Sequence, residues 1–464
     1  MRFGGLAVVG ELARALDVEG RIDRELARER RARAVKVRRR GASPAQLVLA
    51  LAECQLAGGS CFRDLQEVRA DEAGAPLRIV DQTPSVPAAL QRAKDFRRVH
   101  CQRIERALAD AGHELDRRSG RERSHEPATI DLDATQIEVY GRHKQGAARN
   151  RQGQMSYAPH AAFWAQTGRT LTTELVSGAR EKLTGAECAR IVRRAISLLP
   201  TSNDPLQRRG PVCFRIDSAY YQLELLAALR AERACFTVSV PRNQAMWKAL
   251  AEIDEDAWQD ALEMPGAQVA ATTYTPQGWK HEPLRLIIRR TVFSAAQIAR
   301  LKGSRRLKTI HPEQLQLALD GQLDEVYGYS FILTDLHWAH PLFIEYFHRH
   351  RAQVEERLKD TKLGQALRHL PSGDQNANRV WLTAALTALN LTAFCCDVSP
   401  AAGASSDPDA KPQRRHGKAL RNLFFCIPLR IVRTARRLIL RPPAGYPHRQ
   451  VLQDTLDAIY ALGP

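Results

Sequence analysis

The chain has 464 residues, of which 44% are hydrophobic, so it is long enough for roughly three domains with a sizeable core. Its 69 Lys and Arg residues outnumber its 51 Asp and Glu residues, and the net charge of +18 indicates a polyanionic partner, either nucleic acid or an acidic membrane. The nine cysteines include no CxxC pair, which argues against a zinc site and suits a reducing cytoplasm.

Residues 1–120 are predicted to form a helical N-terminal region. Ser43 followed by Pro44 is typical of a helix start, because Ser caps the first turn and Pro fits its first position. A second helical stretch is predicted over residues 86–115. Residues 117–127 are polar and charged, and they are interpreted as a linker.

From residue 129 the pattern changes, and residues 129–140 alternate and are rich in β-branched residues, which is typical of a strand. A capping box at Thr184-Gly-Ala-Glu187 predicts a helix start. In chain order we expect three strands, a helix, a strand, a helix and a strand. Their residues are 129–140, 157–164, 170–176, 184–199, 212–217, 220–231 and 235–240. That order favours an α/β fold whose core, residues 125–240, is an RNase H-like mixed sheet.

The rest of the chain is predicted to return to this core after an insertion. Residues 241–325 are interpreted as a β-rich insertion subdomain, and residues 326–398 as the second part of the core. The run Val380–Cys396 is slightly short for a bilayer span and is interrupted by Thr and Asn, so we expect a buried core helix there. Residues 399–416 are a linker, and residues 417–464 are predicted to be a basic helical C-terminal region.

Two basic segments are candidate DNA contacts. The first lies in the helical N-terminal region, a predicted DNA-binding region, and includes Arg38 and Arg39. The second lies in the C-terminal region, where three arginines recur at helical spacing, namely Arg430, Arg433 and Arg437. Contacts between such residues and phosphates give an affinity that is sensitive to salt and tolerant of sequence.

Three acidic residues stand in contexts that suit a metal site. Asp133 lies on the first predicted strand, Asp217 ends the fourth, and Glu355 lies in a later basic helical stretch. Mg²⁺ prefers carboxylate oxygens, and two such ions about 4 Å apart can activate a nucleophile and relieve charge on the leaving oxygen of a phosphodiester. The three acids therefore suggest the cutting and joining of DNA.

Each acid also has a plain structural interpretation. Asp131 shares the strand face of Asp133 and is its rival, and both acids could lie on an exposed face. Asp217 could cap the helix that follows it. Glu355 could belong to a solvated helix face with charge pairs. The predicted helix places four residues within an arc of roughly 60°, namely His348, Arg351, Glu355 and Lys362.

These residues resemble the motifs of bacterial insertion-sequence DDE transposases of the group with a Tyr-(2)-Arg-(3)-Glu-(6)-Lys motif. Arg351, Glu355 and Lys362 match the last three positions, whereas His348 stands at the Tyr position. The Asp-x-Thr motif of the first strand matches residues 133–135, and the second-aspartate motif is similar to residues 215–221. The resemblance covers most of the chain.

The resemblance implies that Asp133, Asp217 and Glu355 are catalytic and bind Mg²⁺, for which Mn²⁺ can substitute. It implies DNA contacts by Arg351 and Lys362, with His348 still able to donate to a phosphate. It also implies binding to terminal inverted repeats and cut-and-paste transfer to target DNA by a homodimer. Some members of the group form a hairpin intermediate with a base stacked on an aromatic residue. Three tryptophans could supply that platform, namely Trp247, Trp258 and Trp279.

Two other functions stay open from the sequence. His348 at the Tyr position would fit a catalytically inactive, element-derived protein that only binds DNA. The same carboxylates would also serve an RNase H-like nuclease that cleaves without strand transfer. We expect a bacterial cytoplasmic protein that associates with the nucleoid when it binds DNA, and no membrane partner.

Overall fold

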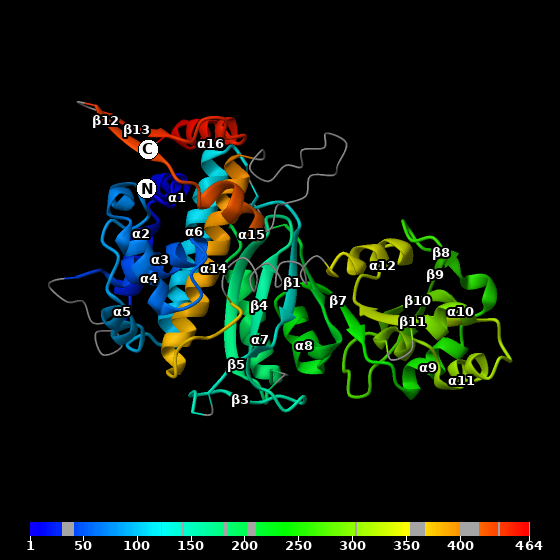
Figure 1. The fold of residues 1–464 in the computed structure, drawn as a ribbon. Coiled ribbons are helices and arrows are strands. Elements are labelled where there is room, and N and C mark those ends of the chain that lie inside the picture. Colours follow the sequence, from blue (N-terminus) through cyan, green and yellow to red (C-terminus); the bar gives the residue numbers. More distant parts are fainter. Residues whose placement is uncertain are drawn as a thin grey trace.

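The computed structural model describes residues 1–29, 41–121, 123–141, 143–180, 183–201, 210–301, 304–352, 367–399, 417–434 and 437–463. Four predicted site residues lie outside these ranges, namely Arg38, Arg39, Glu355 and Lys362. Within the described residues the fold is a mixed α/β arrangement. A large sheet crosses the molecule from a bundle of N-terminal helices to a smaller set of helices at the far end (Figure 1).

The sheet has 11 strands among the described residues. Its first half follows the order β5-β4-β1-β6-β7. Strand β4 is antiparallel to both β5 and β1, whereas β1, β6 and β7 are parallel to one another. In the same order their bounds are Arg169–Ser177, Met155–Trp164, Ala128–Ala134, Val212–Ile216 and Cys235–Val240. Two short strands, β2 (Ile137–Glu138) and β3 (Ala148–Arg149), also pair with β4.

The second half of the sheet comes largely from the predicted insertion. Strand β11 (Glu325–Thr334) pairs antiparallel with β7, and it is followed by β10 (Leu284–Ser294), β9 (Ala267–Tyr274) and β8 (Gln259–Asp260). These strands extend the core sheet, because β11 occupies the hydrogen-bonding edge that β7 offers. The short helices between them are α9 (Gln244–Ala251), α10 (Ala295–Arg300) and α11 (Pro312–Leu319).

Alternation of side chains gives the first half of the sheet two unlike faces. One face is apolar and packs beneath α7 (Gly185–Ser197) and α8 (Leu223–Ala231) through Ile130, Leu132, Phe214 and Ile216. Helix α7 begins with the predicted capping box of Thr184 and Glu187. The other face carries polar residues and lies beneath α12 (Pro341–Arg349), and both candidate aspartates belong to it.

The N-terminal helices enclose a long helix from near the end of the chain, α14 (Gln375–Val398), in one hydrophobic core. They are α1 (Leu6–Ala15), α2 (Val18–Ala27), α3 (Pro44–Leu56), α4 (Leu65–Ala70), α5 (Val86–Ala93) and α6 (Arg98–Arg118). The predicted start of α3 is confirmed by reciprocal hydrogen bonds between Ser43 and Gln46. Helix α14 is long and apolar enough to cross a membrane, but 83% of its apolar window is buried inside the protein, as expected of a core helix.

The C-terminal region corrects one prediction. Residues 430–434 and 437–441 form two antiparallel strands, β12 (Arg430–Thr434) and β13 (Arg437–Arg441), and not a helix. Pro428 and Pro442 limit any helix here to a short segment, and β-branched Ile431, Val432 and Ile439 favour extended backbone. Helical elements flank the strands, namely α15 (Gly417–Leu420), a π-turn (Arg421–Phe425) and α16 (Arg449–Ala461).

Candidate active site

Asp133 and Asp217 lie side by side because of the register between two parallel strands. In β1 and β6, Asp131 is opposite Arg215 and Leu132 is opposite Ile216. The next pair in this register is Asp133 and Asp217. Asp217 directly follows β6 and keeps extended backbone angles, with φ −78° and ψ 161°. Both carboxylates therefore face away from the apolar side of the sheet, at the same edge.

A guanidinium group lies between these two carboxylates. Arg351 Nη1 is 3.6 Å from Asp133 Oδ2, and Arg351 Nη2 is 3.7 Å from Asp217 Oδ1. The Asp133 and Arg351 side chains are mostly buried, whereas the Asp217 side chain is 37% exposed. Each carboxylate also accepts a hydrogen bond from the next backbone N–H, that of Ala134 or Ser218. The Arg351 guanidinium therefore bridges the Asp133 and Asp217 carboxyl groups.

Asp131 occupies a different environment from Asp133. It is fully buried and forms a bidentate ion pair with Arg215, with Nε–Oδ1 at 2.6 Å and Nη2–Oδ2 at 2.7 Å. The Arg215 Nη1 group donates in addition to the Phe347 carbonyl oxygen on α12 at 3.0 Å. Asp131 thus ties β1, β6 and α12 together, while Asp133 stands at the open end of the same strand face.

His348, which was predicted to contact DNA, lies on α12 with its side chain turned toward the sheet. Its side chain is 6% exposed, with Nδ1 2.8 Å from Thr237 Oγ1 and Nε2 2.9 Å from Ser239 Oγ. Burial lowers the pKa of His348 to about 3, so the ring is neutral. Both ring nitrogens face β7 and lie within hydrogen-bonding distance of its hydroxyl groups.

The predicted helix face is also corrected at this point. Helix α12 ends at Arg349, and Arg351 follows in a turn. The Arg351 N–H donates to the His348 carbonyl oxygen at 2.9 Å. His348 and Arg351 therefore do not share one continuous helix face. The single-sequence pattern could not reveal this break, because the segment contains neither Pro nor Gly.

Two residues on the apolar side of the sheet support the turn that follows Asp217. The Tyr220 hydroxyl is 2.6 Å from His160 Nδ1, and both side chains are buried. Burial lowers the pKa of His160 to about 4, and burial followed by the Asp133 charge raises the pKa of Tyr220 well above its ordinary value. Tyr220 was visible in the sequence as part of the motif after Asp217. His160 gave no signal, since it is a single His within an apolar strand.

Comparison with known proteins assigns a family. The family model described as Transposase DDE domain group 1 matches residues 3–300 and 319–464. The chain belongs to this transposase family. No curated protein matches the chain. Among solved structures, the cryo-EM structure of a piggyBac transposase synaptic complex with hairpin DNA aligns with a TM-score of 0.42 and 10% identity, over 91% of this chain and 80% of that one.

The carboxylates of this transposase suit a hard divalent cation. Asp133 and Asp217 present oxygen donors on one face of adjacent strands, and a cationic group already lies between them. Within the described ranges there is no cluster of three or more His, Cys, Asp or Glu side chains able to hold a metal. Glu355, the predicted third ligand, falls outside those ranges.

The tryptophans predicted as stacking platforms in the transposase all have packing partners. Trp247 contacts the rings of His311, Tyr329 and Phe331 edge-on. Trp258 lies under the Arg290 guanidinium, which is 4.3 Å from the ring centroid, and Trp279 is 8% exposed. Among the described residues, the large apolar side chain with the greatest exposure is that of Trp338, at 79%, between β11 and α12.

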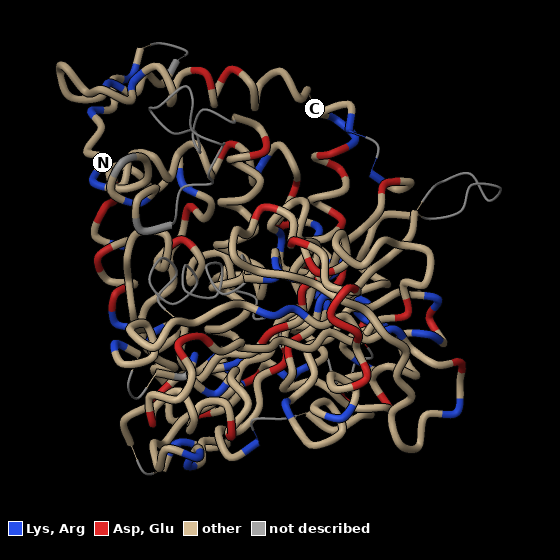
Figure 2. The backbone as a smooth tube through the Cα atoms, turned by 90° about the vertical axis from the view of Figure 1, so that its right-hand side faces the viewer, with Lys and Arg blue, Asp and Glu red and all other residues tan. Residues whose placement is uncertain are grey.

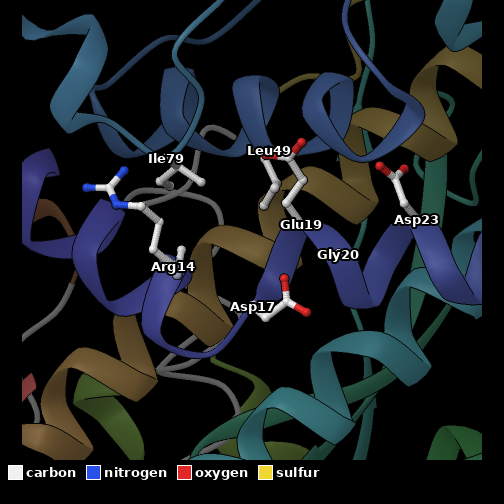
Figure 3. Close-up of a pocket in the computed structure, with 8 residues that line it drawn as sticks. Arg14, Asp17, Glu19, Gly20, Asp23, Leu49 and Ile79 are labelled. Carbon is white, nitrogen blue, oxygen red and sulfur yellow. The ribbon is translucent and has the colours of Figure 1, made fainter. Parts of the chain in front are cut away.

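A hollow of about 390 Å³ in the N-terminal helices of the transposase is a separate feature (Figure 3). Its lining combines Leu49 and Ile79 with Arg14 of α1 and the acidic residues Asp17, Glu19 and Asp23 of the α2 region. Burial, followed by the nearby Asp23 charge, raises the pKa of Glu19. This acidic lining does not suit a polyanion, and it shares no residue with the aspartate site.

Proposed function

We propose that this transposase cuts and joins DNA with a catalytic site made of Asp133, Asp217 and Glu355. The observation that carries the proposal is the register between β1 and β6, which sets two carboxylates side by side at the end of parallel strands. We propose further that it binds the terminal inverted repeats of an insertion sequence and transfers the element by cut-and-paste.

We also propose that the core is RNase H-like. The order β5-β4-β1-β6-β7, with antiparallel pairing on one side of β1 and parallel pairing on the other, supports this classification. In such a core, the end of the first strand and the end of the adjacent parallel strand offer neighbouring positions for ligands.

The donor set fits Mg²⁺, with Mn²⁺ as a substitute, and Glu355 would complete it. When bound, such ions lower the pKa of a water molecule and stabilise charge on the leaving oxygen. The chain's own contribution is to hold the Asp133 and Asp217 carboxyl groups close together at the end of adjacent strands. Arg351 adds a positive charge at the place where a phosphodiester would approach, and Lys362 would add another.

Other residues position the site without touching DNA. The buried Asp131–Arg215 pair and the His348 contacts to β7 fix α12 against the sheet, and α12 leads into Arg351. The Tyr220–His160 pair holds the turn after Asp217 from the opposite face. This rigid support keeps charged groups in place before the substrate arrives.

The net charge of +18 supports a DNA partner, and we propose that two copies act together on paired ends in the bacterial cytoplasm. Arg430 and Arg433 are exposed on β12 and would contact phosphates. The same role is proposed for Arg437 on β13, and for Arg38 and Arg39, which lie outside the described residues.

A cleavage assay on the DNA that flanks the reading frame tests the proposal. The wild-type protein should nick this DNA only with Mg²⁺ or Mn²⁺ and should then join the freed 3′ end to target DNA. Asp133→Asn and Asp217→Asn should each reduce nicking on the order of 10³-fold, because each removes a charge that the reaction requires. Asp320→Asn, an exposed Asp that follows α11, is the matched control and should retain full activity.

The outcomes separate the proposed function from its alternatives. If the wild-type protein binds these ends but shows no metal-dependent nicking, the chain is a DNA-binding protein without catalysis. If nicking occurs without any joining to target DNA, the chain is a nuclease. Equal nicking by wild type and Asp217→Asn would remove Asp217 from the catalytic site.

A further inference from the structure

The C-terminal ribbon, formed by β12 (Arg430–Thr434) and β13 (Arg437–Arg441), is anchored to the N-terminal segment at its base. The Leu429 N–H donates to the Met1 carbonyl oxygen at 3.0 Å, and the Gly4 N–H donates to the Ile427 carbonyl oxygen at 2.7 Å. Beyond this base the two strands pair with each other and with no other described strand. Figure 1 shows the ribbon extending away from the N-terminal helices.

Two apolar side chains in the outer part of the ribbon are exposed. Leu438 and Ile439 are 45% and 37% exposed, whereas Leu440, nearer the base, packs against the N-terminal core. An isolated two-stranded ribbon is at best marginally stable in water, and apolar side chains on it gain from being covered. The ribbon therefore has the properties of a segment that is completed by a partner.

The charge of the ribbon determines which partner fits. Arg430 lies directly opposite Arg441, and both are exposed, so two like charges face each other across the strands. Such a pair is unfavourable unless an anion lies near it. Residues 417–453 contain eight Lys and Arg residues and no Asp or Glu, while acidic and basic residues are interspersed over most of the molecule (Figure 2). A polyanion is the complementary partner.

We propose that the ribbon binds duplex DNA by entering its major groove. The groove is about 12 Å wide and accepts a two-stranded ribbon. By the register of the strands, Val432 and Ile439 share a face with Arg430 and Arg441. The arginines would hold phosphates at the groove edge, and the two apolar residues would contact the base edges. This ribbon proposal depends on the proposed function in one respect, the choice of DNA as the partner.

Binding of a labelled 30-base-pair duplex, measured by fluorescence anisotropy without divalent metal, tests the ribbon apart from catalysis. Arg430→Gln/Arg441→Gln should weaken binding about ten-fold or more and should lower the slope of log Kd against log salt by about 2. Arg430→Lys/Arg441→Lys should retain most of the slope. The control, Arg190→Gln/Arg193→Gln, removes the same charge from exposed positions on α7 and should change little.

Two further results decide the mode of binding. Dimethyl sulfate methylates guanine N7 in the major groove, and the wild-type protein should protect guanines that the Gln double variant leaves reactive. Equal affinity and slope for the Gln double variant and the control would overturn the proposal, as would unchanged N7 reactivity. If Leu438→Ser/Ile439→Ser dissociates a DNA-free dimer but leaves DNA affinity intact, the ribbon joins two copies and the proposal fails. If the ribbon variants bind DNA as the wild type does and the protein still nicks DNA, the ribbon proposal fails but the proposed function is unaffected.

Discussion

At the scale of single residues, the site depends on the different environments of two aspartates, Asp131 and Asp133, that share one face of a strand. Asp131 is buried and is paired bidentately with Arg215 inside the protein. Asp133, two residues later, shares a loosely held guanidinium with Asp217, at distances of 3.6 and 3.7 Å. The first pair is a structural connection, and the second is a group of charges that a substrate or a cation can rearrange.

This difference predicts opposite effects for two identical substitutions. Asp131→Asn leaves Arg215 buried without its carboxylate and should lower the free energy of unfolding by about 3 kcal/mol. Asp133→Asn removes one of two like charges, so it should leave stability unchanged or raise it while abolishing cleavage. Thermal melting and the nicking assay, carried out on both variants at a temperature where both are folded, provide the measurement.

The comparison has a clear contrary outcome. If Asp131→Asn melts like the wild-type protein but no longer nicks DNA, then Asp131 is the ligand and the assignment of Asp133 is wrong. Asp131→Asn should instead keep its activity per folded molecule. The exposed Asp320→Asn variant serves as the reference for both readouts.

At the scale of secondary-structure elements, the sequence predicted those parts whose signals are local. The N-cap of α3, the capping box of α7 and the turn between strands β4 and β5 are set by residues within a few positions of each other. The C-terminal ribbon was missed because arginines at Arg430, Arg433 and Arg437 fit helical spacing as well as an extended hairpin. The pairing of Asp131 with Arg215 was also inaccessible, because it depends on the register between strands 84 positions apart.

One connection between elements predicts how the sheet is joined to the N-terminal helices. Arg169 on β5 binds Asp116 of α6 bidentately, at 2.6 and 2.7 Å, and Asp397 of α14 at 2.9 Å. Arg169→Met should lower the free energy of unfolding by about 3 kcal/mol, because among the described residues buried Asp116 then keeps one ion-pair partner, Arg123, at 3.4 Å. Urea denaturation followed by circular dichroism measures the loss.

A second substitution and a control make that test specific. Asp116→Leu in the Arg169→Met background should restore much of the stability, since it removes the uncompensated charge. Arg117→Met breaks the contact of an exposed guanidinium with Glu114 on the same helix and should cost far less stability than Arg169→Met. Equal losses for Arg169→Met and Arg117→Met would show that the buried network does not join these elements.

At the scale of the whole molecule, the folded state keeps several ionisable groups neutral that would be charged in the unfolded chain. Burial lowers the pKa of His113 and of His160 to about 4, and that of His348 to about 3. Burial has the opposite effect on the carboxyl group of Glu53, whose pKa rises to about 8. On acidification from neutral pH the histidines destabilise the fold, and Glu53 partly offsets them.

The contribution of His348 to the pH dependence of stability can be measured separately, because the direction in which its pKa is shifted is known. A histidine whose folded pKa lies below the unfolded value of about 6.5 contributes its full stability above that pH, and this contribution falls as the pH drops toward 3. Between pH 7 and pH 5 the wild-type protein should therefore lose about 2 kcal/mol more stability than His348→Gln. Gln can still form hydrogen bonds to Thr237 and Ser239, so the comparison removes the titration and keeps the contacts.

Urea denaturation at both pH values gives the difference, with exposed His143→Gln as a control that should follow the wild type. If His348→Gln loses as much stability as the wild type, then His348 titrates normally, and the tight packing of α12 on β7 that holds Arg351 near the aspartates is not present in solution.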